Sequence, residues 1–235
     1  MNEDKKIRSN SQLLLAYSAP YFAYVFIASV FDKIVSVETS YLLRIIVVTG
    51  LLLWFKKWYF ALSGPKRPFV SIIAGICTGF LGAFIWVLLI NPFTQGQSDQ
   101  TAWSDSAFIL RLLSAGLLVP LLEEILMRGF LFRFALQWDK ARKNREKDPL
   151  QTTLDHRSVN EVTPGEWSWM AIIVSTLAFT SGHHMQEWPA AIAYGVLMAW
   201  LYIIRKDLLS CIVAHAVTNI SLALYVLNTG KWYLW

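Results

Sequence analysis

The residues best suited to chemistry lie in three short clusters within otherwise apolar sequence. The first holds Glu123 and Glu124, with Arg128 four residues after the second glutamate. Glu124 and Arg128 share a helix face, so they can form an ion pair. Glu123 is rotated by ~100° on an ideal helix and can face a cavity instead. This cluster predicts one structural carboxylate and one available as a base, with a charged helix end at a membrane border as the alternative.

The other two clusters are built on histidine. Phe179 and His183 are four residues apart on one helix face, and His184 follows directly. His215 and Asn219 have the same spacing, and both side chains can donate hydrogen bonds. Taken alone, the first of these clusters also fits a polar helix end. The second also fits a hydrogen-bonded contact between membrane helices.

Together the clusters contain the groups that peptide hydrolysis by general base catalysis requires. A carboxylate beside a histidine can deprotonate a water molecule. A second histidine with an asparagine can stabilise the oxyanion that follows. The combination therefore predicts a peptide hydrolase more strongly than any single cluster does.

The composition indicates that these groups lie inside a membrane. Of the 235 residues, 55% are hydrophobic and only 16% are charged, whereas a typical soluble domain has ~25% charged residues. This excludes a soluble enzyme with an ordinary surface, and the hydrophobicity excludes intrinsic disorder. Two cysteines are too few for a disulfide-rich secreted domain. We therefore expect an all-α, polytopic integral membrane bundle.

About seven stretches are long and apolar enough to cross a bilayer, with a range of six to eight. They are residues 13–31, 41–62, 69–90, 107–136, 169–184, 188–204 and 208–228. The first is expected to be an uncleaved helix, because its apolar run exceeds that of a signal peptide. Residues 1–105 then form an N-terminal part without a motif, and 106–228 a catalytic core with a polar cytoplasmic linker at 139–166. Residues 229–235 form a short tail.

Basic residues predict the orientation of this bundle. They gather before the first span (Lys5, Lys6 and Arg8) and in the gaps after the second, fourth and sixth spans, whereas the opposite side has only Lys33 and Lys231. The positive-inside rule then places the N-terminus in the cytoplasm and the C-terminus outside. These basic residues at the membrane ends account for the net charge of +5, so the charge does not indicate a nucleic-acid partner.

The three clusters, in this order, resemble the CPBP family of CAAX proteases and bacteriocin-processing proteases. The matching motifs are Glu123-Glu124-x-x-x-Arg128, Phe179-x-x-x-His183 and His215-x-x-x-Asn219. The resemblance covers about residues 107–225, half of the chain. It implies a glutamate-type intramembrane endopeptidase that needs no metal or other cofactor and acts on a membrane-anchored or transmembrane protein.

The resemblance also implies roles for the motif residues. Glu123 and His183 would activate the water, and His215 and Asn219 would hold the oxyanion. Arg128 would fix Glu124, and Phe179 would give structural support. His184 would be an accessory residue.

A second, narrower resemblance concerns the setting of the enzyme. The His183-His184 pair, Trp188 and the segment Gly230-Lys231-Trp232 look like the subgroup found near bacterial exosortase-type systems. This implies a protein of the bacterial inner membrane that takes part in C-terminal processing or sorting of exported proteins.

Three alternatives compete with this interpretation. A zinc protease has possible ligands in Glu123, Glu124, His183, His184 and His215, but the chain lacks His-Glu-x-x-His. A cysteine enzyme is possible because Cys211 precedes His215 by one helical turn. A transporter or membrane scaffold can use the same buried polar groups.

Depth poses a separate difficulty. Straight helices place His183 ~20 Å and His215 ~10 Å from the cytoplasmic side. Tilt, a bend at Pro120 or a short fifth helix is needed to bring them level.

Overall fold

The computed structural model describes residues 7–94 and 102–234, and all regular structure in these ranges is helical. The long helices are α1 (Asn10–Phe31), α2 (Val37–Phe55), α3 (Pro68–Ile90), α8 (Trp169–Ser181), α9 (Trp188–Arg205) and α10 (Leu208–Thr229). A helical run from 105 to 143 comprises α4 (Asp105–Leu113), η3 (Ser114–Leu118), α5 (Val119–Glu124), η4 (Ile125–Leu131) and α6 (Phe132–Lys143). Short elements are η1 (Lys56–Trp58), η2 (Asn91–Phe93), α7 (Pro149–His156), η5 (Val159–Glu161), η6 (Met185–Glu187) and η7 (Trp232–Leu234).

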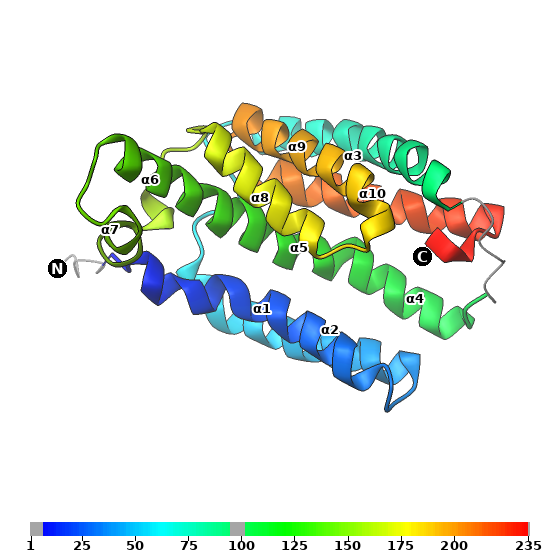
Figure 1. Cartoon of the computed structure of the whole chain (residues 1–235). Helices are drawn as coiled ribbons and strands as arrows, with labels where there is room; N and C mark the ends of the chain where they lie inside the picture. Colours follow the sequence, from blue (N-terminus) through cyan, green and yellow to red (C-terminus); the bar gives the residue numbers. More distant parts are fainter. Residues whose placement is uncertain (1–6, 95–101, 235) are drawn as a thin grey trace.

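The helices form three layers (Figure 1). The run from α4 to α6 lies in the middle and contacts the α1–α2 hairpin on one side. On its other side it contacts α8 and α10, which pack with α3 and α9. The motif-bearing helices therefore meet where the middle layer packs against the layer of α3, α8, α9 and α10.

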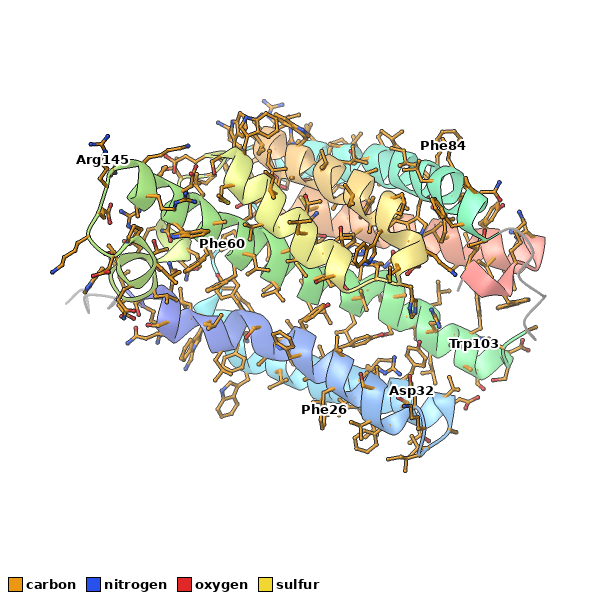
Figure 2. The ribbon with its side chains drawn as sticks, in the orientation of Figure 1. Phe26, Asp32, Phe60, Phe84, Trp103 and Arg145 are labelled. Carbon is orange, nitrogen blue, oxygen red and sulfur yellow. The ribbon has the colours of Figure 1, made fainter. Side chains whose placement is uncertain are left out.

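Large apolar side chains cover the outside of the bundle. Phe26 on α1 and Phe84 on α3 are 61% and 66% exposed and point outward on opposite sides (Figure 2). By length and composition, α1, α2 with η1, α3 with η2, η6 with α9, and α10 can each cross a membrane, and α8 is a shorter apolar helix. The fold class, a polytopic helical membrane bundle, is confirmed, whereas seven crossings stay a prediction.

Two predicted spans end earlier than expected. The second stops at Trp58, because the following segment turns away so that the Leu62 carbonyl accepts hydrogen bonds from the first two N–H groups of α10, at 3.0 Å each. The fifth, α8, stops at Ser181, where the N–H of Gly182 closes the helix on the Phe179 and Thr180 carbonyls. His183 and His184 therefore follow the helix instead of ending it.

The polar segment at 139–166 is packed against the start of α1. Asn10 is fully buried, and its amide donates to the Thr153 carbonyl at 2.8 Å and accepts from the Val159 N–H at 2.6 Å. Arg133 donates to the carbonyl of Val159 at 2.9 Å. The segment thus connects the middle layer to α1. Lys5, Lys6 and the last residue of the predicted tail lie outside the described residues.

Candidate active site

Glu124 and Arg128 form the buried ion pair that their spacing suggests. Nη1 of Arg128 donates to Oε1 of Glu124 over 3.0 Å, and both side chains are fully buried. Nη2 of Arg128 donates to the Gly195 carbonyl on α9 at 3.2 Å. The guanidinium carbon lies 5.5 Å from the ring centre of Phe179 on α8. The pair therefore ties the middle helix to both helices of the α8–α9 hairpin.

Two π-helical segments flank the glutamates, and the first has a local cause. Proline has no N–H, and its ring clashes with the carbonyl four residues back in a regular α-helix. The π-helical segment Ser114–Leu118 ends two residues before Pro120, and the Val119 N–H bonds to the Ser114 carbonyl. The next carbonyl, that of Ala115, accepts a 2.7 Å hydrogen bond from Nδ2 of Asn219. The Ala115 carbonyl is thus free to accept a hydrogen bond from α10. Such π-helical segments are frequent at functional sites.

His215 on α10 lies between the two glutamates. Its Nδ1 is 3.0 Å from Oε1 of Glu124, and its Nε2 is 3.9 Å from Oε2 of Glu123. Because a carboxylate can only accept, Nδ1 carries the proton and donates it to Glu124. That bond fixes the ring and directs Nε2 toward Glu123, whose side chain is 17% exposed. Glu124 is therefore fully buried and bonded through Oε1 to both Arg128 and His215, whereas Glu123 remains accessible.

His183 reaches the same region from the turn after α8. Its Nδ1 lies 2.9 Å from the Phe179 carbonyl, so Nδ1 donates and Nε2 is left to accept. Its ring centre is 4.6 Å from that of Phe179 and 5.2 Å from that of Trp86 on α3. Among the described residues, no hydrogen bond or ion pair joins His183 to Glu123. The sequence argument did not foresee that His215 is the histidine nearer to Glu123.

One cavity of about 270 Å³ collects most of these side chains. Its walls include His183, His184, His215, Asn219 and Phe179. Glu123 is not among the wall residues and contacts the cavity through His215. The α8–α9 turn lies partway along the bundle (Figure 1), so the two histidine motifs lie at a similar depth. Of the three explanations considered for their depth, the structure therefore has the short fifth helix.

Helix α3 supports the cavity, although it has none of the motifs. The Thr218 hydroxyl on α10 lies 2.9 Å from the Gly79 carbonyl, and the Tyr194 hydroxyl on α9 donates to Thr218 at 3.2 Å. A side chain at Gly79 would come within 2.7 Å of a backbone carbonyl of α10. Gly79 therefore lets two backbones approach closely, as small residues do between membrane helices.

The sequence reasoning missed Trp86, Tyr194 and Thr218 as cavity residues. A stripe of small residues on α3, Gly75, Gly79 and Gly82, was the available signal that this helix packs tightly against a partner. No sequence signal shows which partner that is.

The structure also places the residues that the cysteine and zinc alternatives would use. Cys211 is fully buried, and its thiol lies 3.8 Å from the Met198 carbonyl, away from the cavity walls. The Nδ1 of His215 is directed at Glu124. Within residues 7–94 and 102–234, no group of three or more His, Cys, Asp and Glu side chains has an arrangement that can hold a metal ion.

The comparison with known families concerns this part of the chain. Residues 105–221 match the family model of type II CAAX prenyl endopeptidase Rce1-like proteins. No curated protein and no solved structure matches the chain. The matched Rce1-like segment runs from α4 into α10 and contains every motif residue from Glu123 to Asn219, whereas α1 to α3 lie outside it. The match supports a CAAX-type intramembrane endopeptidase, a protease that works in the bilayer on a membrane-associated substrate.

Proposed function

We propose that the protein hydrolyses a peptide bond of a membrane-associated protein with a water molecule activated by Glu123 and His183. The observation that carries the proposal is the position of His215 between a buried, ion-paired glutamate and an accessible one. Two adjacent carboxylates in such different surroundings are suited to different tasks, one positioning a neighbour and one exchanging protons.

In this mechanism Glu123 takes the proton of the attacking water, assisted by the unprotonated Nε2 of His183. The resulting hydroxide attacks the scissile carbonyl carbon and forms a tetrahedral oxyanion. Glu123 then returns the proton to the leaving amine, so that the water supplies one proton to each product. No metal or other cofactor takes part in this scheme.

His215 and Asn219 stabilise the oxyanion. One N–H of the Asn219 amide is held by the Ala115 carbonyl, which fixes the amide and leaves its second N–H as a donor. In its protonated form, His215 donates through Nε2 while Nδ1 remains bonded to Glu124. Donors held in place before the reaction stabilise developing charge more effectively than mobile ones.

The setting that we propose is a bacterial inner membrane, with the N-terminus in the cytoplasm and the C-terminus outside. Arg145 lies at one end of the bundle and Trp103 at the other (Figure 2), and the basic end would face the cytoplasm. The substrate would be an exported protein that is processed or sorted through its C-terminal region.

The direct test uses the purified full chain in liposomes with a set of quenched fluorescent transmembrane peptides. Glu123→Gln and His183→Ala should abolish cleavage. His215→Ala and Asn219→Ala should lower kcat by roughly 10²–10³-fold if they hold the oxyanion. Glu161→Gln, a matched change at an exposed carboxylate of η5, should cleave like the wild type.

Thermal unfolding of each variant separates lost chemistry from lost structure. Wild-type rates in a folded Glu123→Gln variant would refute the mechanism. Activity should persist in the presence of a strong chelator, and a loss that added zinc restores would favour the metal alternative. Retained cleavage in Cys211→Ala would exclude the cysteine alternative.

A further inference from the structure

Arg111 is a cationic wall residue of the catalytic cavity that the mechanism above does not use. It lies on α4, one helical turn before Ala115, and lines the cavity together with His183 and Asn219. Its guanidinium carbon is 4.7 Å from the ring centre of Trp103. A cation at such a site in a membrane protein is costly, so it is a candidate for a function.

The other walls include apolar side chains and one carboxylate. Trp86, Phe179 and Leu222 are apolar and fit uncharged side chains. Glu187 is the second charged wall residue, and its Oε2 accepts a 2.9 Å hydrogen bond from the His184 N–H. A guanidinium binds carboxylates through two parallel hydrogen bonds, which gives both strength and direction.

The volume limits what can enter. The cavity of about 270 Å³ is close to the lower end of ligand pockets, ~300–1,000 Å³. An intact helix with its side chains is ~10–12 Å wide, so only a short extended segment fits. Leu234 of the short helix η7 contributes an apolar side chain to the wall.

We propose that Arg111 binds a carboxylate of the substrate in the same cavity as the scissile bond. It thereby selects the bond that is cut. The ligand chemistry is a carboxylate, supplied either by the C-terminus of the substrate or by an aspartate or glutamate side chain. The proposal rests on the proposed proteolysis, because it assigns a specificity residue to the same cavity.

The experiment compares three peptides that differ only in this charge. Each has one apolar transmembrane sequence, ending as a free acid, as an amide, or as an amide with glutamate in the last position. We measure kcat/KM in liposomes for the wild type, Arg111→Gln, Arg111→Lys and Arg145→Gln. The last variant removes the same charge at the far end of the bundle (Figure 2). Binding is measured separately by fluorescence anisotropy in the Glu123→Gln background.

The wild type should cleave and bind the acid at least roughly tenfold better than the amide, as expected for a charge-assisted hydrogen bond. Arg111→Gln should bring the acid-to-amide ratio close to one. Arg111→Lys should keep part of the preference, and Arg145→Gln should keep all of it. The glutamate peptide should behave like the acid if a side-chain carboxylate suffices, and like the amide if the chain terminus is required.

The outcomes separate the two proposals. Equal cleavage of acid and amide by the wild type would overturn the role of Arg111 and leave proteolysis intact. No cleavage of any peptide would count against proteolysis, and the binding ratio would still decide the role of Arg111. If Arg111→Gln does not fold, equal binding of acid and amide to the Glu123→Gln protein would overturn the proposal. If Glu187→Gln abolishes the preference as completely as Arg111→Gln, then Arg111 acts by pairing with Glu187, and the proposal is wrong.

Discussion

Two ion pairs with the same spacing lie on the same helical run. Glu124–Arg128 and Asp139–Lys143 are both four residues apart, with N–O distances of 3.0 and 2.7 Å. The first pair is completely buried, whereas Asp139 and Lys143 are 13% and 70% exposed. The two pairs have the same order of charges and the same spacing, although their surroundings differ.

The difference shows that burial decides what a charge pair does. The Lys143 ammonium of the outer pair lies in water, which screens its attraction to Asp139, so the contribution of this pair to stability is small. The inner pair also holds Gly195 and His215, and breaking it would leave a charge buried without a partner. The same spacing therefore gives a pair with an exposed cation at the helix end in one place and a buried support of the candidate active site in the other.

The largest effect is expected when the inner pair loses its cation. Arg128→Ala leaves Glu124 buried beside His215, which should lower the free energy of unfolding by ~3–5 kcal/mol. Unfolding in mixed micelles with increasing dodecyl sulfate measures this value. A loss below about 1 kcal/mol would mean that the inner pair resembles the outer one.

Removing both charges of the inner pair together tests whether the loss in Arg128→Ala comes from an unpaired buried charge. Glu124→Leu with Arg128→Met leaves no uncompensated charge, so much of the stability lost in Arg128→Ala should return. The remaining deficit should be ~1–3 kcal/mol, because Nδ1 of His215 loses its buried acceptor. Cleavage should be absent in the double variant, since the His215 ring is no longer held by Glu124. An active double variant would contradict the assigned role of Glu124.

The outer pair should tolerate the equivalent change. Lys143→Ala is expected to cost ~0.3–0.5 kcal/mol, the value of an exposed pair on a helix. The same micelle titration, run beside Arg128→Ala, gives the contrast directly. Cleavage should not change, because Lys143 lies far from the cavity walls.

The smallest effect concerns the pH dependence of the outer pair, which lies beyond the fourth predicted span. The hydrogen bond from Lys143 holds the pKa of Asp139 below its ordinary value of 3.8. This contribution is present above that value and disappears as the pH falls through the lowered pKa. The stability difference between wild type and Asp139→Asn should therefore be seen at neutral pH and vanish in strong acid. A difference that grows in acid would reverse the assigned sign.

Local pattern was enough to predict several parts of this protein. Runs of apolar residues located the five described helices that are long and apolar enough to cross a membrane, and the shorter α8, because only a continuous helix satisfies its backbone hydrogen bonds in lipid. The spacing of Glu124 and Arg128 gave their ion pair, because residues four apart share a helix face. It did not show that Gly195 accepts from the same guanidinium, since that contact joins residues 67 positions apart in sequence.

Other parts depended on how distant helices pack. The spacing of Phe179 and His183 suggested a shared helix face, yet the helix ends between them and the ring is held by the Phe179 carbonyl. The role of α3 in the cavity could not be foreseen, because glycines mark close approach without naming the partner.

The sequence by itself therefore determined that this is a helical membrane protein, and it singled out the residues that we propose carry its chemistry. Only the tertiary structure decided that His215 lies between Glu123 and Glu124 and that Arg111 reaches the cavity. The physical reason is that periodicity fixes the direction of a side chain around its own helix axis. The depth, tilt and neighbours of that helix are set by packing among segments far apart in the chain.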